Sequence, residues 1–382
     1  MENVANIIGL LERDALDLPK HYTLGDYEEN LAKWLSAFLE QVENLTPENS
    51  ISREIITASP EIHMVCDVLR DTVSLYLRGD LHIAYEKFQK ALEVLAPWLQ
   101  KIIYPISELA SEFVRCEQNP TIQFRGHLYR ARPMGSDPLA TLNLDDIFHM
   151  PFDLRHKVSS QRYSVPGLPC LYLGGSLWIC WEELGRPTFH NLQVSRFAAA
   201  PDASVLDLAW RPRVIAHFLR CPQGRELSAE FVVGQIMCWP LLASCSVKRR
   251  YRGLDAPFVA EYILPQLLLR SIRDQKLCDG LRYFSTQVTG YVHYPDAGAN
   301  YVFPVQTKTA AGHCQVLSGK FAFTSPISWS MLQSSDIPPN VGRLFEKWEI
   351  PLGDHEYIQY GKTEFAALER KLSGINVRSL NT

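Results

Sequence analysis

The chain has 382 residues, of which 46% are hydrophobic and 21% charged, and its formal net charge is −4. This length and composition are typical of a globular protein that buries large cores in two or three domains. The slightly acidic balance excludes a nucleic-acid binder that relies on bulk positive charge. Nine cysteines without a CxxC pair indicate reduced thiols, as in cytoplasmic proteins.

The N-terminus and the apolar windows predict a chain that is neither exported nor inserted in a membrane. The opening sequence MENVANIIGLLERDAL has acidic residues where a signal peptide has a basic flank. The most apolar window, 231–245, is interrupted by Gln235 and Pro240 and is too short to span a bilayer. We therefore expect a cytoplasmic protein with neither a membrane nor a nucleic-acid partner.

The first 118 residues predict helices. Segment 26–45 repeats apolar residues at spacings of three and four, namely Leu31, Trp34, Leu35, Phe38, Leu39 and Val42. Segments 62–79 and 80–102 show the same pattern, with Asp80 as an N-cap. Successive helices with short connections favour a small bundle, which is the region where we expect the contacts of a homo-oligomer.

The pattern changes near Asn119-Pro120. Segment 121–133 alternates like a strand, and segments 170–175, 279–287 and 300–305 also predict strands. The expected fold is therefore of the α+β class, with a mainly antiparallel sheet. It has an all-helical region over 1–118, a sheet domain over 119–320, and a C-terminal extension over 321–382 whose last helix docks on the body.

Familiar catalytic motifs are incomplete. Asp145, Asp146 and His149 cluster, but no HExxH or paired His/Cys spacing accompanies them, so we expect no metal site. The segment GGSLW at 174–178 lacks the last glycine of a GxSxG nucleophile turn, and the chain has no GxxxxGK[ST] loop and no GxGxxG after a strand. The basic run 246–253 favours a solvated loop, with a phosphate-rich ligand as the alternative.

One set of polar residues in the sheet domain suits chemistry on a dinucleotide: Arg130, Arg162, Tyr172, Glu183 and Ser285. Arginine binds phosphate bidentately, and a tyrosine ring can stack on a flat cation such as nicotinamide. A carboxylate stabilises the positive charge that develops as a base leaves a ribose. The residues alone leave a structural alternative open, with Arg162 and Glu183 as a buried salt bridge, Tyr172 as a core aromatic and Ser285 as a strand-end hydroxyl.

Three segments, taken in order, resemble the motifs of the RES-domain family, which is named for an arginine, a glutamate and a serine. They are LYRAR at 128–132, QRYSVPGLPCLYLGGSLWICWEE at 161–183 and DGLRYFSTQ at 279–287, and the resemblance covers roughly residues 120–310. By position, the family's two arginines, tyrosine, glutamate and serine match Arg130, Arg162, Tyr172, Glu183 and Ser285.

The chain departs from the family pattern at three places. Tyr163-Ser164 follow the turn arginine where the family has an asparagine, and Phe284 replaces the proline of a YPS strand. Glu182 stands where the family has a small residue, so either Glu182 or Glu183 is the matching carboxylate. The spacing from the tyrosine favours Glu183, because adjacent helical residues project about 100° apart.

The resemblance implies an ADP-ribosyltransferase-like split β-sandwich around an NAD cleft, and an enzyme that consumes NAD by phosphorolysis or hydrolysis of the nicotinamide–ribose bond. NAD is then a substrate rather than a tightly bound cofactor, and inorganic phosphate is a second substrate of the phosphorolysis route. Arg130 and Arg162 would clamp phosphates, Tyr172 would stack on nicotinamide, Ser285 would bind near the nicotinamide ribose, and Glu183 would stabilise the cation.

Family members are often bacterial toxins held by an antitoxin, so an inhibitory partner protein is expected. Two alternatives remain: ADP-ribosyl transfer to a protein or small-molecule acceptor, and a non-catalytic binding module that acts through its helical region.

Overall fold

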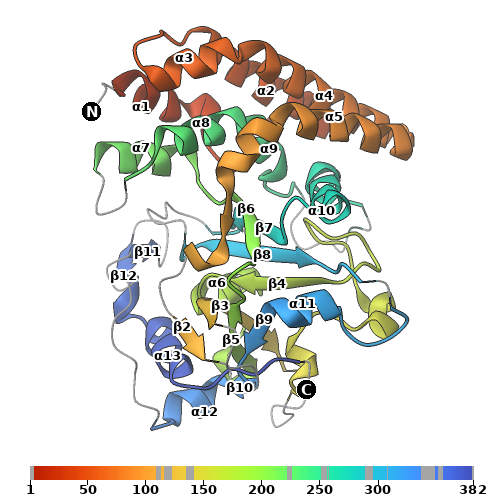
Figure 1. The fold of residues 1–382 in the computed structure, drawn as a ribbon, viewed down its shortest axis with the longest axis vertical. Helices are drawn as coiled ribbons and strands as arrows, with labels where there is room; N and C mark the ends of the chain where they lie inside the picture. The colour runs from red at the N-terminus through yellow and green to blue at the C-terminus, as the bar shows by residue number, and fades with distance from the viewer. Residues whose placement is uncertain are drawn as a thin grey trace. The chain divides into compact units, whose positions relative to one another are not determined.

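A computed structural model describes residues 4–108, 113–115, 123–134, 142–221, 226–250, 256, 258–288, 296–307, 309–336, 349–351 and 356–380. The chain forms two compact units, whose elements are labelled in Figure 1. The helical unit comprises Met1–Ile103, Ser160–Tyr163 and Trp210–Gln275, and the sheet unit comprises Tyr104–Ser159, Ser164–Ala209 and Lys276–Thr382. The boundary predicted at residue 118 lies outside the described residues.

The helical unit joins N-terminal helices to helices from the middle of the chain. The first group is α1 (Ala5–Leu11), α2 (Tyr27–Glu43), α3 (Ser50–Thr57), α4 (Ser59–Leu77) and α5 (Leu81–Leu99). The second group is α7 (Pro212–Arg220), α8 (Ala229–Met237), α9 (Trp239–Cys245) and α10 (Ile263–Gln275). Helices α2, α4 and α5 coincide with the three periodic segments of the sequence.

The two groups of helices share one core. Phe38 of α2 stacks on Trp239 of α9, with ring centroids 4.3 Å apart. Every residue of α9 is buried, so this short helix has no solvated face and depends on its neighbours. Residues 210–275 lie within the sheet domain predicted over 119–320, but the structure groups them with the N-terminal helices. The difference arises because a boundary predicted along the chain cannot show that a later segment returns to an earlier core.

The sheet unit is built on one large mixed sheet. Its strands are β1 (Ile103–Pro105), β2 (Phe113–Arg115), β3 (Gln123–Pro133), β4 (Cys170–Gly174), β5 (Leu192–Ala199), β6 (Ser204–Leu208), β7 (Gly280–Phe284), β8 (Ala299–Pro304), β9 (Phe321–Phe323) and β10 (Ile327–Ser328). The order is β1-β6-β7-β8-β4-β3-β5-β10, with β2 on β3 and β9 on β5. Strands β6 and β7 run parallel, and the pairs from β7 to β10 are antiparallel. The protein is therefore of mixed α/β composition.

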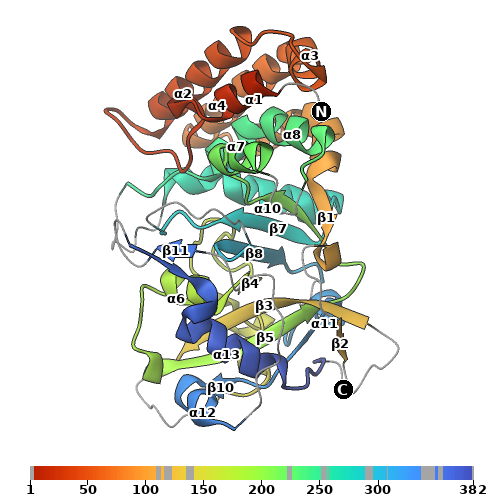
Figure 2. The same cartoon turned by 90° about the vertical axis from the view of Figure 1, so that its left-hand side faces the viewer.

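The sheet consists of two halves that are joined at one point. Strands β4 and β8 pair over five residues, and β3 and β5 pair along most of their length. Figure 2 shows where the labelled strands of each pair lie in the sheet. Between the halves, β3 and β4 share one registered pair, Tyr129 opposite Gly174. The halves therefore diverge on either side of this pair.

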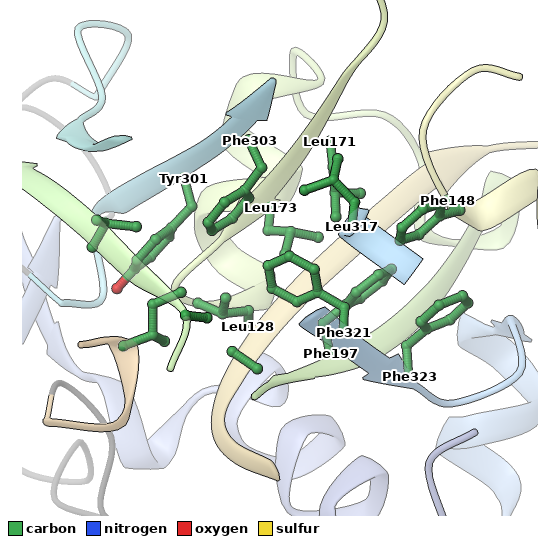
Figure 3. Close-up of a cluster of buried hydrophobic side chains, with 14 of the residues drawn as sticks. Leu128, Phe148, Leu171, Leu173, Phe197, Tyr301, Phe303, Leu317, Phe321 and Phe323 are labelled. Carbon is green, nitrogen blue, oxygen red and sulfur yellow. The ribbon is translucent and has the colours of Figure 1, made fainter. Parts of the chain in front are cut away.

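The two faces of the sheet differ because side chains alternate along each strand. One face, here called the aromatic face, carries the buried cluster of Figure 3: Leu128, Phe148, Leu171, Leu173, Phe197, Tyr301, Phe303, Leu317, Phe321 and Phe323. The other face, here called the α6 face, carries Tyr129 and Ala131 beneath helix α6 (Leu177–Glu183).

The C-terminal segment packs on the sheet unit. It contains α11 (Gln315–Lys320), α12 (Trp329–Ser334), the hairpin of β11 (Glu349–Pro351) with β12 (Tyr357–Gln359), and α13 (Glu364–Ser373). Helix α13 contributes Phe365, Leu368 and Leu372 to the cluster beneath α6. In the parts of the chain that the structure describes, no helix combines the length and apolar character that a membrane crossing requires.

Candidate active site

The turn between β4 and α6 is packed tightly against residues 296–299. A Cβ at Gly174 would lie 2.6 Å from Sγ of Cys180, and one at Gly175 would lie 2.2 Å from the carbonyl oxygen of Asp296. Ser176 is the N-cap of α6, because its Oγ accepts the backbone N–H of Ile179 at 3.1 Å. The two glycines and this cap therefore fix the start of α6, and with it the position of Glu183, the last residue of the helix.

The adjacent glutamates of α6 have different surroundings. Glu182 is buried, and it accepts hydrogen bonds from Nε1 of Trp178 at 3.0 Å and from Nε of Arg186 at 2.9 Å. Glu183 is exposed, and its Oε1 accepts a hydrogen bond from Nδ2 of Asn300 at 2.7 Å. Glu182 is thus bound by Trp178 of its own helix and by Arg186 just beyond it, whereas Glu183 is directed to strand β8.

Tyr172 lies on the same face of the sheet as the Glu183–Asn300 pair. Its neighbours Leu171 and Leu173 belong to the aromatic cluster, so alternation places Tyr172 on the α6 face. Asn300 is there for the same reason, since Tyr301 is on the aromatic face. The Tyr172 and Ser164 hydroxyls lie 2.9 Å apart, which orients the phenol.

Ser285 follows β7 and continues its alternation. Tyr283 is registered opposite Asn300, so a residue two positions later falls on the α6 face as well. The backbone N–H of Ser285 donates to the carbonyl of Gly298 at 3.3 Å, and its Oγ accepts the N–H of Gln287 at 3.1 Å. Tyr172, Glu183 and Ser285 are therefore brought to one face of the sheet.

Arg130 is placed differently. It follows Tyr129, which is on the α6 face, so it projects from the aromatic face, opposite to Tyr172 and Glu183. Its Nη1 atom is buried and has no hydrogen-bond partner within the described residues. Burial, together with the neighbouring charge of Arg132, lowers the pKa of Arg130 to about 9. Arg132 itself donates to the carbonyl of Asp146.

Arg162 belongs to the helical unit. Its Nη1 donates to the carbonyls of Cys245 at 3.2 Å and Val247 at 2.9 Å, and its guanidinium carbon lies 5.4 Å from the ring centroid of Tyr262. Arg249, from the basic run, lies 5.9 Å from the same ring centroid. Residues 251–253 of that run lie outside the described residues.

A buried charge network that the sequence did not predict joins strands β6 and β7. Arg282 of β7 is fully buried and donates to Asp207 of β6 at 2.6 Å and to Asp296. Burial opposes its charge, but the adjacent Asp207 carboxylate keeps the pKa of Arg282 above its ordinary value. A signal was present in the sequence, since VLDL and GLRYF each place one charged residue inside an apolar strand.

In the cluster of acidic residues and histidine at 145–149, the side chain of His149 holds backbone groups together. His149 is buried, its Nδ1 donates to the carbonyl of Met150 at 2.8 Å, and its Nε2 accepts the N–H of Cys314 at 2.9 Å. Both ring nitrogens are thus used, and burial lowers the pKa of His149 to about 4. In the described parts of the chain, no group of three or more His, Cys, Asp or Glu side chains could hold a metal ion.

Comparison with known proteins gives one curated relative. A protein of Bacillus subtilis (strain 168) named "Putative toxin YopC" is 29% identical to this chain over 376 residues, which cover 93% of this chain and 78% of that protein. No family model matches the chain, and no solved structure matches it.

Proposed function

We propose that the protein is an enzyme that consumes NAD by cleaving the nicotinamide–ribose bond, and that it acts as a toxin. The observation that carries the proposal is the placement of Tyr172, Glu183 and Ser285 on one face of the sheet, with the Glu183 carboxylate held by Asn300. The order of these residues in the RES-like segments and the name of the Bacillus relative support it.

The proposed reaction breaks the bond between the anomeric carbon of the ribose and the nicotinamide nitrogen. Both bonding electrons leave with nicotinamide, which departs as a neutral base while positive charge develops on the ribose. Glu183 stabilises that charge, and Tyr172 stacks on the nicotinamide ring. An oxygen of phosphate or water then bonds to the anomeric carbon, and with water the released proton goes to solvent.

The phosphate-binding role of Arg130 rests on the resemblance to the RES motif, because its side chain projects from the face opposite to Tyr172 and Glu183. Its Nη1 atom is buried and lacks a partner within the described residues, and an anion bound on that face would offset the cost of this burial. For Arg162 the role rests on the resemblance to the RES motif, and mutation of this residue tests it separately.

The direct test is to incubate the purified protein with NAD, with and without phosphate, and to measure free nicotinamide and the ribose product. Cleavage that depends on phosphate identifies phosphorolysis, and cleavage without phosphate identifies hydrolysis. If no nicotinamide is released under either condition, the proposed activity is wrong.

The toxin role predicts that expression of the protein arrests bacterial growth. Glu183→Gln should relieve the arrest, and so should co-expression of an inhibitory partner protein.

ADP-ribosyl transfer is less favoured. Transfer needs a group that orients the acceptor, and the second carboxylate next to Glu183 is Glu182. Because Glu182 is buried in an ion pair with Arg186, it is not free for that role. NAD labelled on its adenine distinguishes the two reactions, because transfer leaves the label covalently on an acceptor. A non-catalytic module would instead bind NAD without turnover.

A further inference from the structure

We propose that Asn300 is the positioning residue of Glu183, and that a turn anchored by Arg282 holds Asn300 in place. This inference rests on the proposed function, in which Glu183 stabilises the developing cation. Asn300 touches neither NAD nor the reacting atoms in this scheme. It acts only by fixing the carboxylate.

Glu183 needs such a partner because of where it stands. It is the last residue of a seven-residue helix and is exposed to solvent, so its side chain would otherwise sample several rotamers. Asn300 is 5% exposed and lies within β8, and its Nδ2 fixes Oε1 of Glu183 at 2.7 Å. Glu183 makes no other side-chain hydrogen bond to the described residues, which leaves Oε2 for the ribose.

The residue types around Asn300 fit this role. Gly174 is registered opposite Asn300, and Cys180 and Ile179 of α6 lie where its side chain would be, so the helix that carries Glu183 packs directly against the strand next to Asn300. An amide donates a hydrogen bond without adding charge, whereas an aspartate would repel the carboxylate. The neighbouring charges of Glu182 and Arg186 offset each other in an ion pair at 2.9 Å.

Both ends of the Glu183–Asn300 link are tied to the turn 296–299. At the start of α6, Gly175 donates its N–H to the carbonyl of Ala299 at 2.8 Å, and Ser176 donates its hydroxyl to that of Ala297 at 2.6 Å. The turn leads directly into Asn300 of β8.

Arg282 anchors this turn from the aromatic face. Its guanidinium binds Asp296, the first described residue of the turn, and also binds Asp207 of the neighbouring strand. All of these groups are in the sheet unit. Asn300, which donates the hydrogen bond, and helix α6, which carries the acceptor Glu183, are therefore both held by the buried ion pairs of Arg282.

A double-mutant cycle on nicotinamide release from NAD tests the inference. Asn300→Leu removes the donor at nearly the same size, and we expect it to lower kcat by roughly 10- to 100-fold, as small displacements of a reacting group do. KM should change by less than about threefold, because the lost interaction forms only in the transition state. In a Glu183→Gln background, Asn300→Leu should change the rate by less than about twofold, because the negative charge that Asn300 positions is gone.

Glu182→Gln is the matched control. It removes the adjacent carboxylate and leaves the Asn300 contact intact, so Asn300→Leu should keep its full effect on kcat in that background. A merely structural role of Asn300 would lower activity by the same factor in all backgrounds, and that result would overturn the inference.

The failure of the proposed function is distinguishable from the failure of this inference. If the wild-type protein releases no nicotinamide, the proposed function is wrong, and a second cycle is then measured by urea unfolding. Asn300→Leu should lower the unfolding midpoint more in the wild-type background than in Glu183→Met, which removes the acceptor of the hydrogen bond. Equal shifts in both backgrounds would show that the two side chains are not coupled, and the inference would be wrong.

Discussion

Glu369 of α13 accepts the backbone N–H of Leu177, the first residue of α6, at 2.7 Å. The same oxygen accepts the hydroxyl of Tyr360 at 2.6 Å, and the carboxylate is buried. A residue near the C-terminus therefore secures the start of the helix that ends in Glu183. The C-terminal helix is part of the site's framework.

We expect Glu369→Gln to reduce the free energy of unfolding by about 1–3 kcal/mol, since it weakens two hydrogen bonds to a buried charge. Urea unfolding measures this loss. Glu356→Gln, at an exposed position, is the control and should change stability by less than about 0.5 kcal/mol. Equal effects of the two variants would contradict the role of Glu369.

The adjacent glutamates of α6 should respond in opposite ways to the same substitution. Glu183→Gln is expected to lower NAD cleavage by about 100-fold or more with little change in stability. Glu182→Gln should retain most activity but lose about 1 kcal/mol of stability, because it weakens hydrogen bonds to Trp178 and Arg186. Nicotinamide release and urea unfolding of both variants check this. The reverse pattern would assign the catalytic role to Glu182.

We expect the effects of substituting Arg282 and Asp207 on the free energy of unfolding to depend on each other. Arg282→Met leaves Asp207 buried without its cation and should destabilise the protein by about 3–5 kcal/mol. Adding Asp207→Asn should recover part of that loss, because the uncompensated charge is removed. Thermal unfolding of the single and double variants tests this, and simple additivity of the two losses would contradict it.

We expect substitution of Arg130 to preserve the stability of the protein but to weaken the binding of NAD. Arg130→Met removes a buried cation whose Nη1 has no partner in the described residues, so the variant should be at least as stable as the wild type. NAD should raise the unfolding temperature of the wild type by mass action and raise that of the variant much less. If Arg130→Met were several kcal/mol less stable, or gained as much from NAD, the proposed role would be wrong.

His149 predicts a loss of stability on acidification. Its ring is neutral in the folded protein, where the pKa is about 4, whereas an unfolded histidine has a pKa of about 6.5. The unfolded state therefore binds more protons between these values, and the free energy of unfolding falls as the pH drops from about 7 to about 4. The full effect is about 3 kcal/mol at most.

Urea unfolding at several pH values measures this dependence. His149→Asn should be less stable than the wild type at pH 7 and should lose less stability on acidification. His82→Asn, at an exposed position, should keep the wild-type slope. If removal of His149 left the slope unchanged, other groups would account for the pH dependence.

Local patterns in the sequence predicted much of this architecture. Apolar spacing located α2, α4 and α5, because helices of this length bury one continuous stripe. The segment 170–183 was expected to be a strand followed by a helix, and it forms β4 and α6. These features depend on residues that are close in the chain.

Features that depend on distant partners were not predicted. The choice between Glu182 and Glu183 needed the positions of Arg186 and Asn300. The orientation of Arg130 relative to Tyr172 depends on one registered pair between β3 and β4. No local pattern specifies such a register, because it arises from the packing of the whole sheet.

The interleaved composition of the helical unit has a consequence for how the protein is made. Residues 1–103 leave the ribosome well before α7–α10, which complete their core and follow only after much of the sheet unit has been synthesised. Until then the apolar surfaces that the N-terminal helices share with α7–α10 are uncovered, and they are targets for chaperones or aggregation. Conversely, a fragment that begins near Asn119 would expose the buried surfaces of α8 and α9. The unit is therefore better dissected by point substitution than by truncation.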